Sequence, residues 1–69
     1  MEIQFKKGIY PVEAVTRAVA DYKSICRIII KNEKDCCKCI LFAKTDYIEQ
    51  IKDEFCNYLI ELINEQVNA

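Results

Sequence analysis

Apolar and polar side chains alternate at the start of the chain, where Ile3 and Phe5 stand between polar residues. A repeat of two positions predicts a short strand with one buried face. After Gly8 the repeat changes, and apolar residues recur every three or four positions, as in an amphipathic helix. They are Val12, Val15, Val19 and Tyr22. Because a proline suits the first turn of a helix, we expect this helix to run from about Pro11 to Lys23.

Two segments of high strand propensity follow, residues 25–31 and 36–43, and the polar cluster Asn32–Asp35 between them predicts a hairpin turn. With Glu33 and Lys34 as the two loop residues, the register of the hairpin is fixed. One face would be uniformly apolar, pairing Ile30 with Cys37, Ile28 with Cys39 and Cys26 with Leu41. The other face would be mixed, pairing Ile25 with Phe42, Arg27 with Ile40 and Ile29 with Lys38. We expect the apolar face to pack against helices.

A long helix is predicted at the end of the chain, because no Gly or Pro occurs between Asp46 and Val67. Asp46 and Glu49 have the spacing of a capping box, so we expect the helix to begin there. One apolar stripe comprises Ile48, Ile51, Phe55, Tyr58, Leu59 and Leu62. A second stripe, roughly 100° further round the helix, comprises Cys56, Ile60, Ile63 and Val67.

These elements predict an α+β fold, a two-layer β-α-β-β-α sandwich in which both helices cover one face of a three-stranded sheet. A right-handed β-α-β crossover makes the first strand parallel to the second. The third strand is apolar on both faces apart from Cys36 and Lys38, as a central strand would be. We therefore prefer the strand order 2-3-1, with 1-2-3 as the alternative, in a single small domain that spans residues 1–69.

The composition argues against several classes of protein. The 69 residues are 52% hydrophobic and 30% charged, with one Gly and one Pro, which is typical of a folded domain. Ten basic residues against eleven acidic ones give a net charge of −1, so the basic excess of a nucleic-acid-binding protein is lacking. Histidine is absent, which disfavours most acid–base and nucleophilic mechanisms. We therefore expect a protein that is not an enzyme, has no cofactor and binds no nucleic acid.

No stretch approaches the roughly 20 apolar residues that span a membrane, and the first residues lack the apolar run of a signal peptide. We therefore expect a cytoplasmic protein with no membrane partner, in which the five cysteines stay reduced. A domain of this size buries only about 60% of the surface that its unfolded chain exposes. Such a small core is commonly supported by a metal or by a partner subunit.

The cysteines offer one candidate metal site. Cys36 and Cys39 form a C-x-x-C pair, and together with Cys26 or Cys56 they could hold zinc through three thiolates. However, residues three apart in a strand point to opposite faces and lie roughly 10 Å from each other, which is too far for a disulfide. We favour an interpretation in which Cys26, Cys37 and Cys39 are core residues, with no metal bound, and keep the thiolate zinc domain as the alternative.

A surplus of apolar residues indicates an interaction surface. One sheet face can cover only one stripe of the last helix, which leaves the second stripe, Cys56, Ile60, Ile63 and Val67. The mixed sheet face carries a further apolar set, Ile25, Ile29, Ile40 and Phe42. Two such patches on a domain of 8.1 kDa are typical of protein–protein contacts. We therefore expect these eight residues to bind a protein or peptide partner, with a homodimer as one form of that association.

Two segments resemble a known family. Residues 10–15, Tyr-Pro-Val-Glu-Ala-Val, with Ala18 following, and residues 54–59, Glu-Phe-Cys-Asn-Tyr-Leu, are similar to the HxsD-like proteins of the His-Xaa-Ser peptide-modification system. Proteins of that family are small and occur with radical-SAM maturases and a His-Xaa-Ser repeat peptide. The resemblance implies a non-catalytic accessory or peptide-handling role, whose partner is a peptide-modifying enzyme or its substrate.

Overall fold

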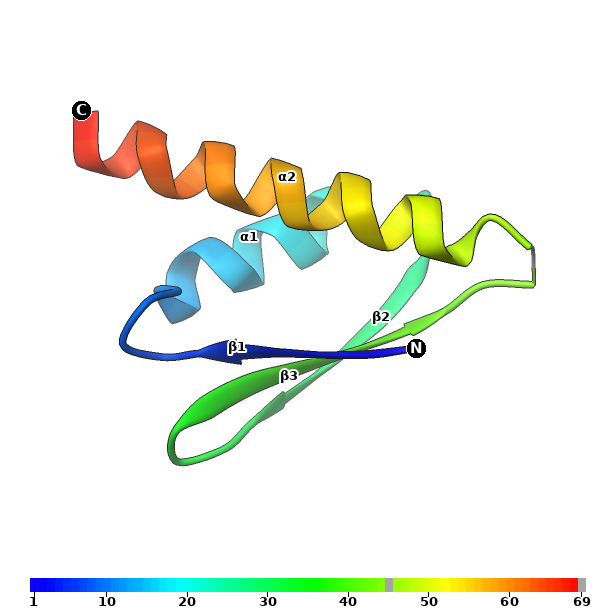
Figure 1. Cartoon of the computed structure of the whole chain (residues 1–69), viewed down its shortest axis with the longest axis horizontal. Helices are drawn as coiled ribbons and strands as arrows, with labels where there is room; N and C mark the ends of the chain where they lie inside the picture. The colour runs from blue at the N-terminus through cyan, green and yellow to red at the C-terminus, as the bar shows by residue number, and fades with distance from the viewer. Residues whose placement is uncertain (45, 69) are drawn as a thin grey trace.

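The computed structural model describes residues 1–44 and 46–68, with side chains as far as Glu65. Five elements follow one another in the predicted β-α-β-β-α order (Figure 1). They are β1 (Glu2–Lys6), α1 (Val12–Asp21), β2 (Arg27–Asn32), β3 (Cys36–Phe42) and α2 (Ile48–Asn68).

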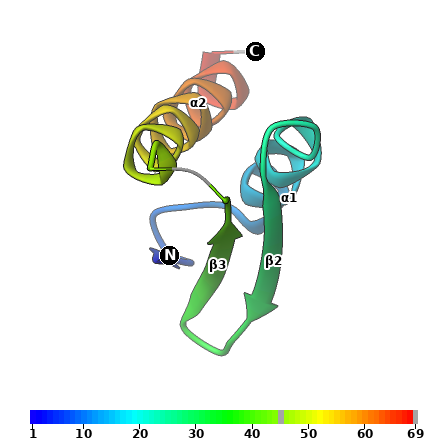
Figure 2. The same cartoon turned by 90° about the vertical axis from the view of Figure 1, so that its right-hand side faces the viewer.

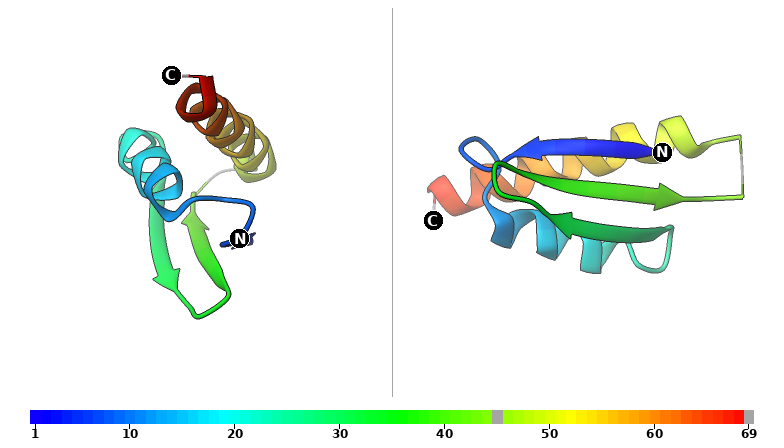
Figure 3. Two further views of the ribbon diagram at one scale, coloured as in Figure 1. Left: turned by 90° about the vertical axis from the view of Figure 1, so that its left-hand side faces the viewer. Right: turned by 90° about the horizontal axis from the view of Figure 1, so that it is seen from below.

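The three strands form one sheet in the order β1-β3-β2, and β3 is antiparallel to both of its neighbours. This order confirms the preferred prediction, and it makes β1 parallel to β2 with β3 between them. Both helices lie on the same side of the sheet (Figure 2). Seen from below, the sheet stands in front of both helices, and no described element covers its other face (Figure 3).

The core lies between the sheet and the two helices. Its buried residues are Phe5, Ala14, Val15, Ala18, Cys26, Cys37, Cys39, Leu41, Phe55, Leu59 and Leu62. The ring of Phe55 lies at its centre, with its centroid 6.1 Å from that of Phe5 and 5.3 Å from that of Tyr22. The first apolar stripe of the last helix therefore faces the core, as the spacing predicts.

The turn of the hairpin lies one residue later than predicted. The chain reverses at Lys34 and Asp35, and the N–H of Glu33 donates to the carbonyl oxygen of Cys36 at 2.9 Å. The ladder that follows is offset by two residues from the predicted register. It pairs Arg27 with Phe42, Ile28 with Leu41, Ile29 with Ile40, Ile30 with Cys39, Lys31 with Lys38 and Asn32 with Cys37. An offset of two keeps each side chain on its predicted face, so the hydrophobic pattern could not distinguish the two registers.

Two elements begin later than predicted because the preceding turns use more residues. The N–H groups of Ile25 and Cys26 both donate to the carbonyl oxygen of Tyr22, at 2.9 Å and 3.0 Å, so these residues belong to the turn after α1 and not to β2. At the last helix, the carbonyl oxygen of Tyr47 accepts the N–H of Ile51 at 3.0 Å. The cap position is therefore Tyr47, one residue after the predicted Asp46.

Candidate interaction surface

The uncovered side of the sheet, called here the open sheet face, is built by alternation along the three strands. Side chains of successive strand residues point to opposite sides, so the residues between the core positions all face away from the helices. They are Glu2, Gln4 and Lys6 of β1, Arg27, Ile29 and Lys31 of β2, and Cys36, Lys38, Ile40 and Phe42 of β3.

The centre of the open sheet face is apolar. The observed register sets Ile29 directly opposite Ile40, and Phe42 is the next residue on the same side of β3. Ile29 is 36% exposed and Phe42 48% exposed, while Ile40 between them is half-buried. Because facing Cβ atoms in a sheet lie about 4.5–5.5 Å apart, these three side chains form one continuous patch.

Arg27, Lys31 and Lys38 lie beside this patch on β2 and β3, whereas Glu2 of β1 lies directly opposite Ile40. Lys6, Arg27, Lys31 and Lys38 stand on the open sheet face against one acid, Glu2, which gives the face a net charge of +3. The whole chain carries −1, so the remaining surface carries −4. The guanidinium carbon of Arg27 lies 5.7 Å from the centroid of the Phe42 ring, a cation–π contact that places positive charge beside the apolar centre.

One of these cations is held by the hairpin turn. Lys38 Nζ lies 2.9 Å from the Oε1 atom of Glu33. The hydrogen bond to Glu33 raises the pKa of Lys38, which means that it favours the charged form of the amine. The pairing also offsets the repulsion between Lys38 and Lys31, which face each other across the strands.

An open pocket of about 550 Å³ continues the open sheet face around the end of β3. Its wall carries the cations Arg27 and Lys44, and its apolar lining includes Phe42, Leu41 and Ile48. The same combination of positive charge and apolar surface therefore extends toward the start of α2.

The structure divides the second stripe of the last helix. Cys56 and Ile63 are half-buried and pack against the core, whereas Ile60 is 47% exposed. The side chain of Val67 lies outside the described residues. Ile25, in the turn after α1, is 55% exposed and does not join the strands. The part of the predicted surface that the structure brings together is thus Ile29, Ile40 and Phe42, with Ile60 on a separate face.

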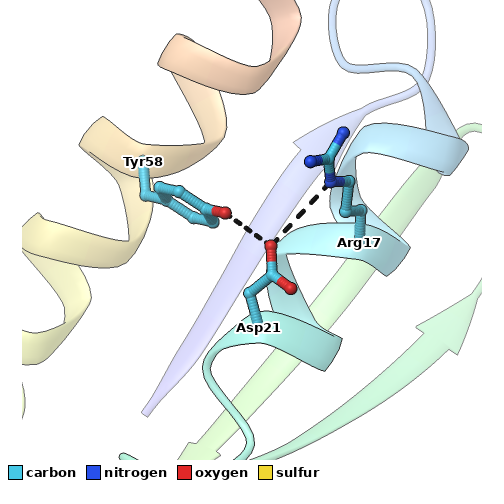
Figure 4. A network of polar contacts seen from close by, with 3 residues as sticks. All are labelled: Arg17, Asp21 and Tyr58. Carbon is cyan, nitrogen blue, oxygen red and sulfur yellow. Dashed lines mark hydrogen bonds and ion pairs between the residues drawn. The ribbon is translucent and has the colours of Figure 1, made fainter.

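A polar network joins the two helices at the side of the core (Figure 4). The hydroxyl of Tyr58 donates to Asp21 Oδ2 at 2.5 Å, and Arg17 Nε lies 3.9 Å from the same oxygen. The hydrogen bond to Asp21 raises the pKa of Tyr58, because ionisation would remove the donated proton. The network fixes how α2 sits beside α1. Sequence reasoning missed it, although Arg17 and Asp21 have the i, i+4 spacing of an ion pair.

The cysteines do not form the metal site considered as the alternative, in the part of the chain that the structure describes. All five thiols are free, and no group of three or more His, Cys, Asp or Glu residues there could hold a metal ion. Cys36 lies on the open sheet face, whereas Cys39 is buried in the core, so the two point away from each other. Cys26 is also buried, and its thiol donates to the carbonyl oxygen of Phe42 at 3.4 Å.

The buried thiols are poorly suited to redox chemistry. Burial raises the pKa of Cys39 to about 12. Burial also raises the pKa of Cys37 and of Cys56. Since the thiolate is the reactive form, none of these three resembles an activated cysteine.

Comparison with models of known protein families, with curated protein sequences and with solved structures gives no match. In the described part of the chain, neither helix combines the length and the apolar character that crossing a membrane requires.

Proposed function

We propose that the protein is a non-catalytic interaction module that binds a protein or peptide partner through its open sheet face and its C-terminal helix. The observation that carries this proposal is the apolar centre formed by Ile29, Ile40 and Phe42, with the cations Arg27, Lys31 and Lys38 beside it. Both helices are engaged on the opposite side of the sheet, so the described part of the chain leaves these side chains in contact with water, where a partner could cover them.

The small size of the domain supports the same proposal. A short chain buries a modest share of its surface, so association adds apolar burial that the monomer lacks and stabilises the folded state by mass action. An accessory role in a peptide-modification system, in the cytoplasm where thiols stay reduced, is the biological setting that the family resemblance favours. In that setting the partner is the modifying enzyme, its peptide substrate, or another copy of the module.

The open sheet face is tested by placing a charge at its apolar centre. We expect the wild-type protein to self-associate as its concentration rises from about 10 to about 500 µM, and Ile40→Asp to remain monomeric because its carboxylate cannot be desolvated in the contact. Sedimentation equilibrium measures the mass. Ile29→Asp, at a more exposed position, repeats the test with less risk to the fold.

The matched control is Ile9→Asp. Ile9 is 66% exposed in the turn after β1, away from the open sheet face. This variant therefore makes the same substitution at an isoleucine that is more exposed than Ile29. We expect this variant to associate as the wild type does. A wild-type protein that stays monomeric throughout would contradict self-association, and equal association by all the variants would contradict the role of the open sheet face.

A further inference from the structure

The outward side of α2, called here the outer helix face, has the chemistry opposite to that of the open sheet face. Its exposed acids are Glu49, Asp53, Glu54, Glu61 and Glu65. At 100° per residue, the exposed Ile60 lies within about 20° of both Glu49 and Asp53 around the helix axis. The nearest cation on this helix is Lys52, whose Nζ lies 3.9 Å from Asp53 Oδ1. Among the side chains that the structure describes, the outer helix face is therefore acidic with one exposed apolar residue, Ile60.

The two faces cannot meet within one molecule. The helices and the sheet form separate layers, and the open sheet face and the outer helix face look away from each other (Figure 2). In two copies they can meet, and their charges of opposite sign would attract.

We propose that the open sheet face of one copy binds the outer helix face of a second copy, an arrangement that rests on the proposed function and specifies its partner. Ile60 would pack on Ile29 and Ile40. Asp53 and Glu49, which lie on the same side of the helix about two and three turns away, would pair with Lys31 and Arg27. The sizes agree, because three strands about 4.8 Å apart form a strip about 10–15 Å wide and a helix is about 10–12 Å across.

Charge argues against the symmetric arrangements. If two open sheet faces were in contact, a net charge of +3 would face a net charge of +3. If two outer helix faces were in contact, acidic side chains would face acidic side chains. Like charges brought together in a contact oppose association. A nucleic acid is the less favoured occupant, because Phe42 is the one aromatic residue of the open sheet face, whereas single strands are bound on successive aromatic side chains.

When the open sheet face of one copy binds the outer helix face of the next, one end of the assembly keeps a free open sheet face and the other end keeps a free outer helix face. Association by this route continues into open chains unless the rotation between copies closes a ring. The contact also depends on charge, so salt weakens it.

The experiment mixes two variants, each with one damaged face. Ile40→Asp damages the open sheet face, and Ile60→Lys puts a cation on the outer helix face. We expect each variant alone to sediment as a monomer, while the equimolar mixture forms a dimer through its two intact faces. Raising the salt from about 0.05 to about 0.5 M should weaken that dimer at least tenfold. Ile9→Lys, outside both faces, should associate as the wild type does.

Other outcomes would overturn the proposal. If the wild type associates and Ile40→Asp abolishes this, but the mixture stays monomeric, the open sheet face binds protein in a different arrangement and only the head-to-tail contact fails. If Ile60→Lys associates like the wild type, the outer helix face is not the occupant. If an oligouridine strand binds the wild type more tightly than a second copy does, and Ile40→Asp abolishes this binding, the open sheet face serves a nucleic acid.

Discussion

Replacing Phe55 with alanine is expected to unfold much of the protein at room temperature. The side chain is fully buried between the helices and the sheet, in ring contact with Phe5 and Tyr22. Truncation of a buried phenylalanine costs about 3–5 kcal/mol, since apolar burial is lost and a cavity remains. The free energy of unfolding of a domain of 69 residues is roughly 3–10 kcal/mol, at about 0.05–0.15 kcal/mol per residue. Urea unfolding followed by circular dichroism measures the loss.

Phe42→Ala provides the matched control, because it removes the same side chain from the open sheet face, where Phe42 is half exposed. This variant should lose less than about 1 kcal/mol of unfolding free energy, mainly because the cation–π contact with Arg27 is removed. Equal losses for the two variants would show that Phe55 is not the centre of the core.

Alkaline pH is expected to destabilise the fold through Cys39. Burial raises its pKa from the ordinary 9.0 to about 12, so the folded state holds the thiol proton more tightly than the unfolded state. This contribution to stability is complete below pH 9 and is lost as the pH rises toward and through 12. The three-unit difference corresponds to about 4 kcal/mol in full, and to about 2 kcal/mol lost by about pH 10.5.

Two tyrosines are also expected to make the fold less stable at alkaline pH. Burial raises the pKa of Tyr22, with the nearby carboxylates Glu54 and Glu61 adding to the shift, and the hydrogen bond to Asp21 raises that of Tyr58. Their contributions are present below pH 10 and are lost as the pH rises above it.

The free energy of unfolding, measured by urea denaturation in a reducing buffer between about pH 8 and about pH 10.5, tests this dependence. Cys39→Ala should be less stable at pH 8 but should lose less stability on going to high pH. Cys36→Ala, at a half-buried thiol on the open sheet face, should keep the wild-type slope. If Cys39→Ala keeps the wild-type slope as well, Cys39 does not carry the effect.

The sequence predicts the layers of this fold because the repeats of its apolar residues are regular. The period of two in β1 and the stripe from Ile48 to Leu62 in α2 each identify the side that faces the core. The central place of β3 follows from its residues being apolar on both faces. The hairpin register did not follow, because a shift of two leaves this pattern unchanged and the turn alone decides between the alternatives.

The burial of the second stripe of the last helix could not be predicted from the spacing of residues within that helix alone. Spacing separates the two stripes, but α2 packs against α1 as well as against β3. Tyr58 accordingly meets α1 through Asp21, and Cys56 is half-buried against the core. Only Ile60, among the described members of that stripe, remains exposed.

The charge distribution was also hidden at the level of the sequence. A net charge of −1 averages over a basic sheet face and an acidic helix face. The cations Lys6, Arg27, Lys31 and Lys38 come from three strands, and only the pairing of those strands brings them together. Their alternation with apolar residues, as at Arg27, Ile29 and Lys31, was the available signal.

The central claim is that the open sheet face is where this protein binds a partner. The most direct test follows the backbone amide NMR shifts of the labelled protein as its concentration rises from about 20 µM to about 1 mM. We predict changes concentrated at Ile29, Lys31, Lys38 and Ile40 and along the outer helix face, with the buried core positions unaffected. Shifts that do not depend on concentration, or changes confined to α1 and the turn around Ile9, would contradict it.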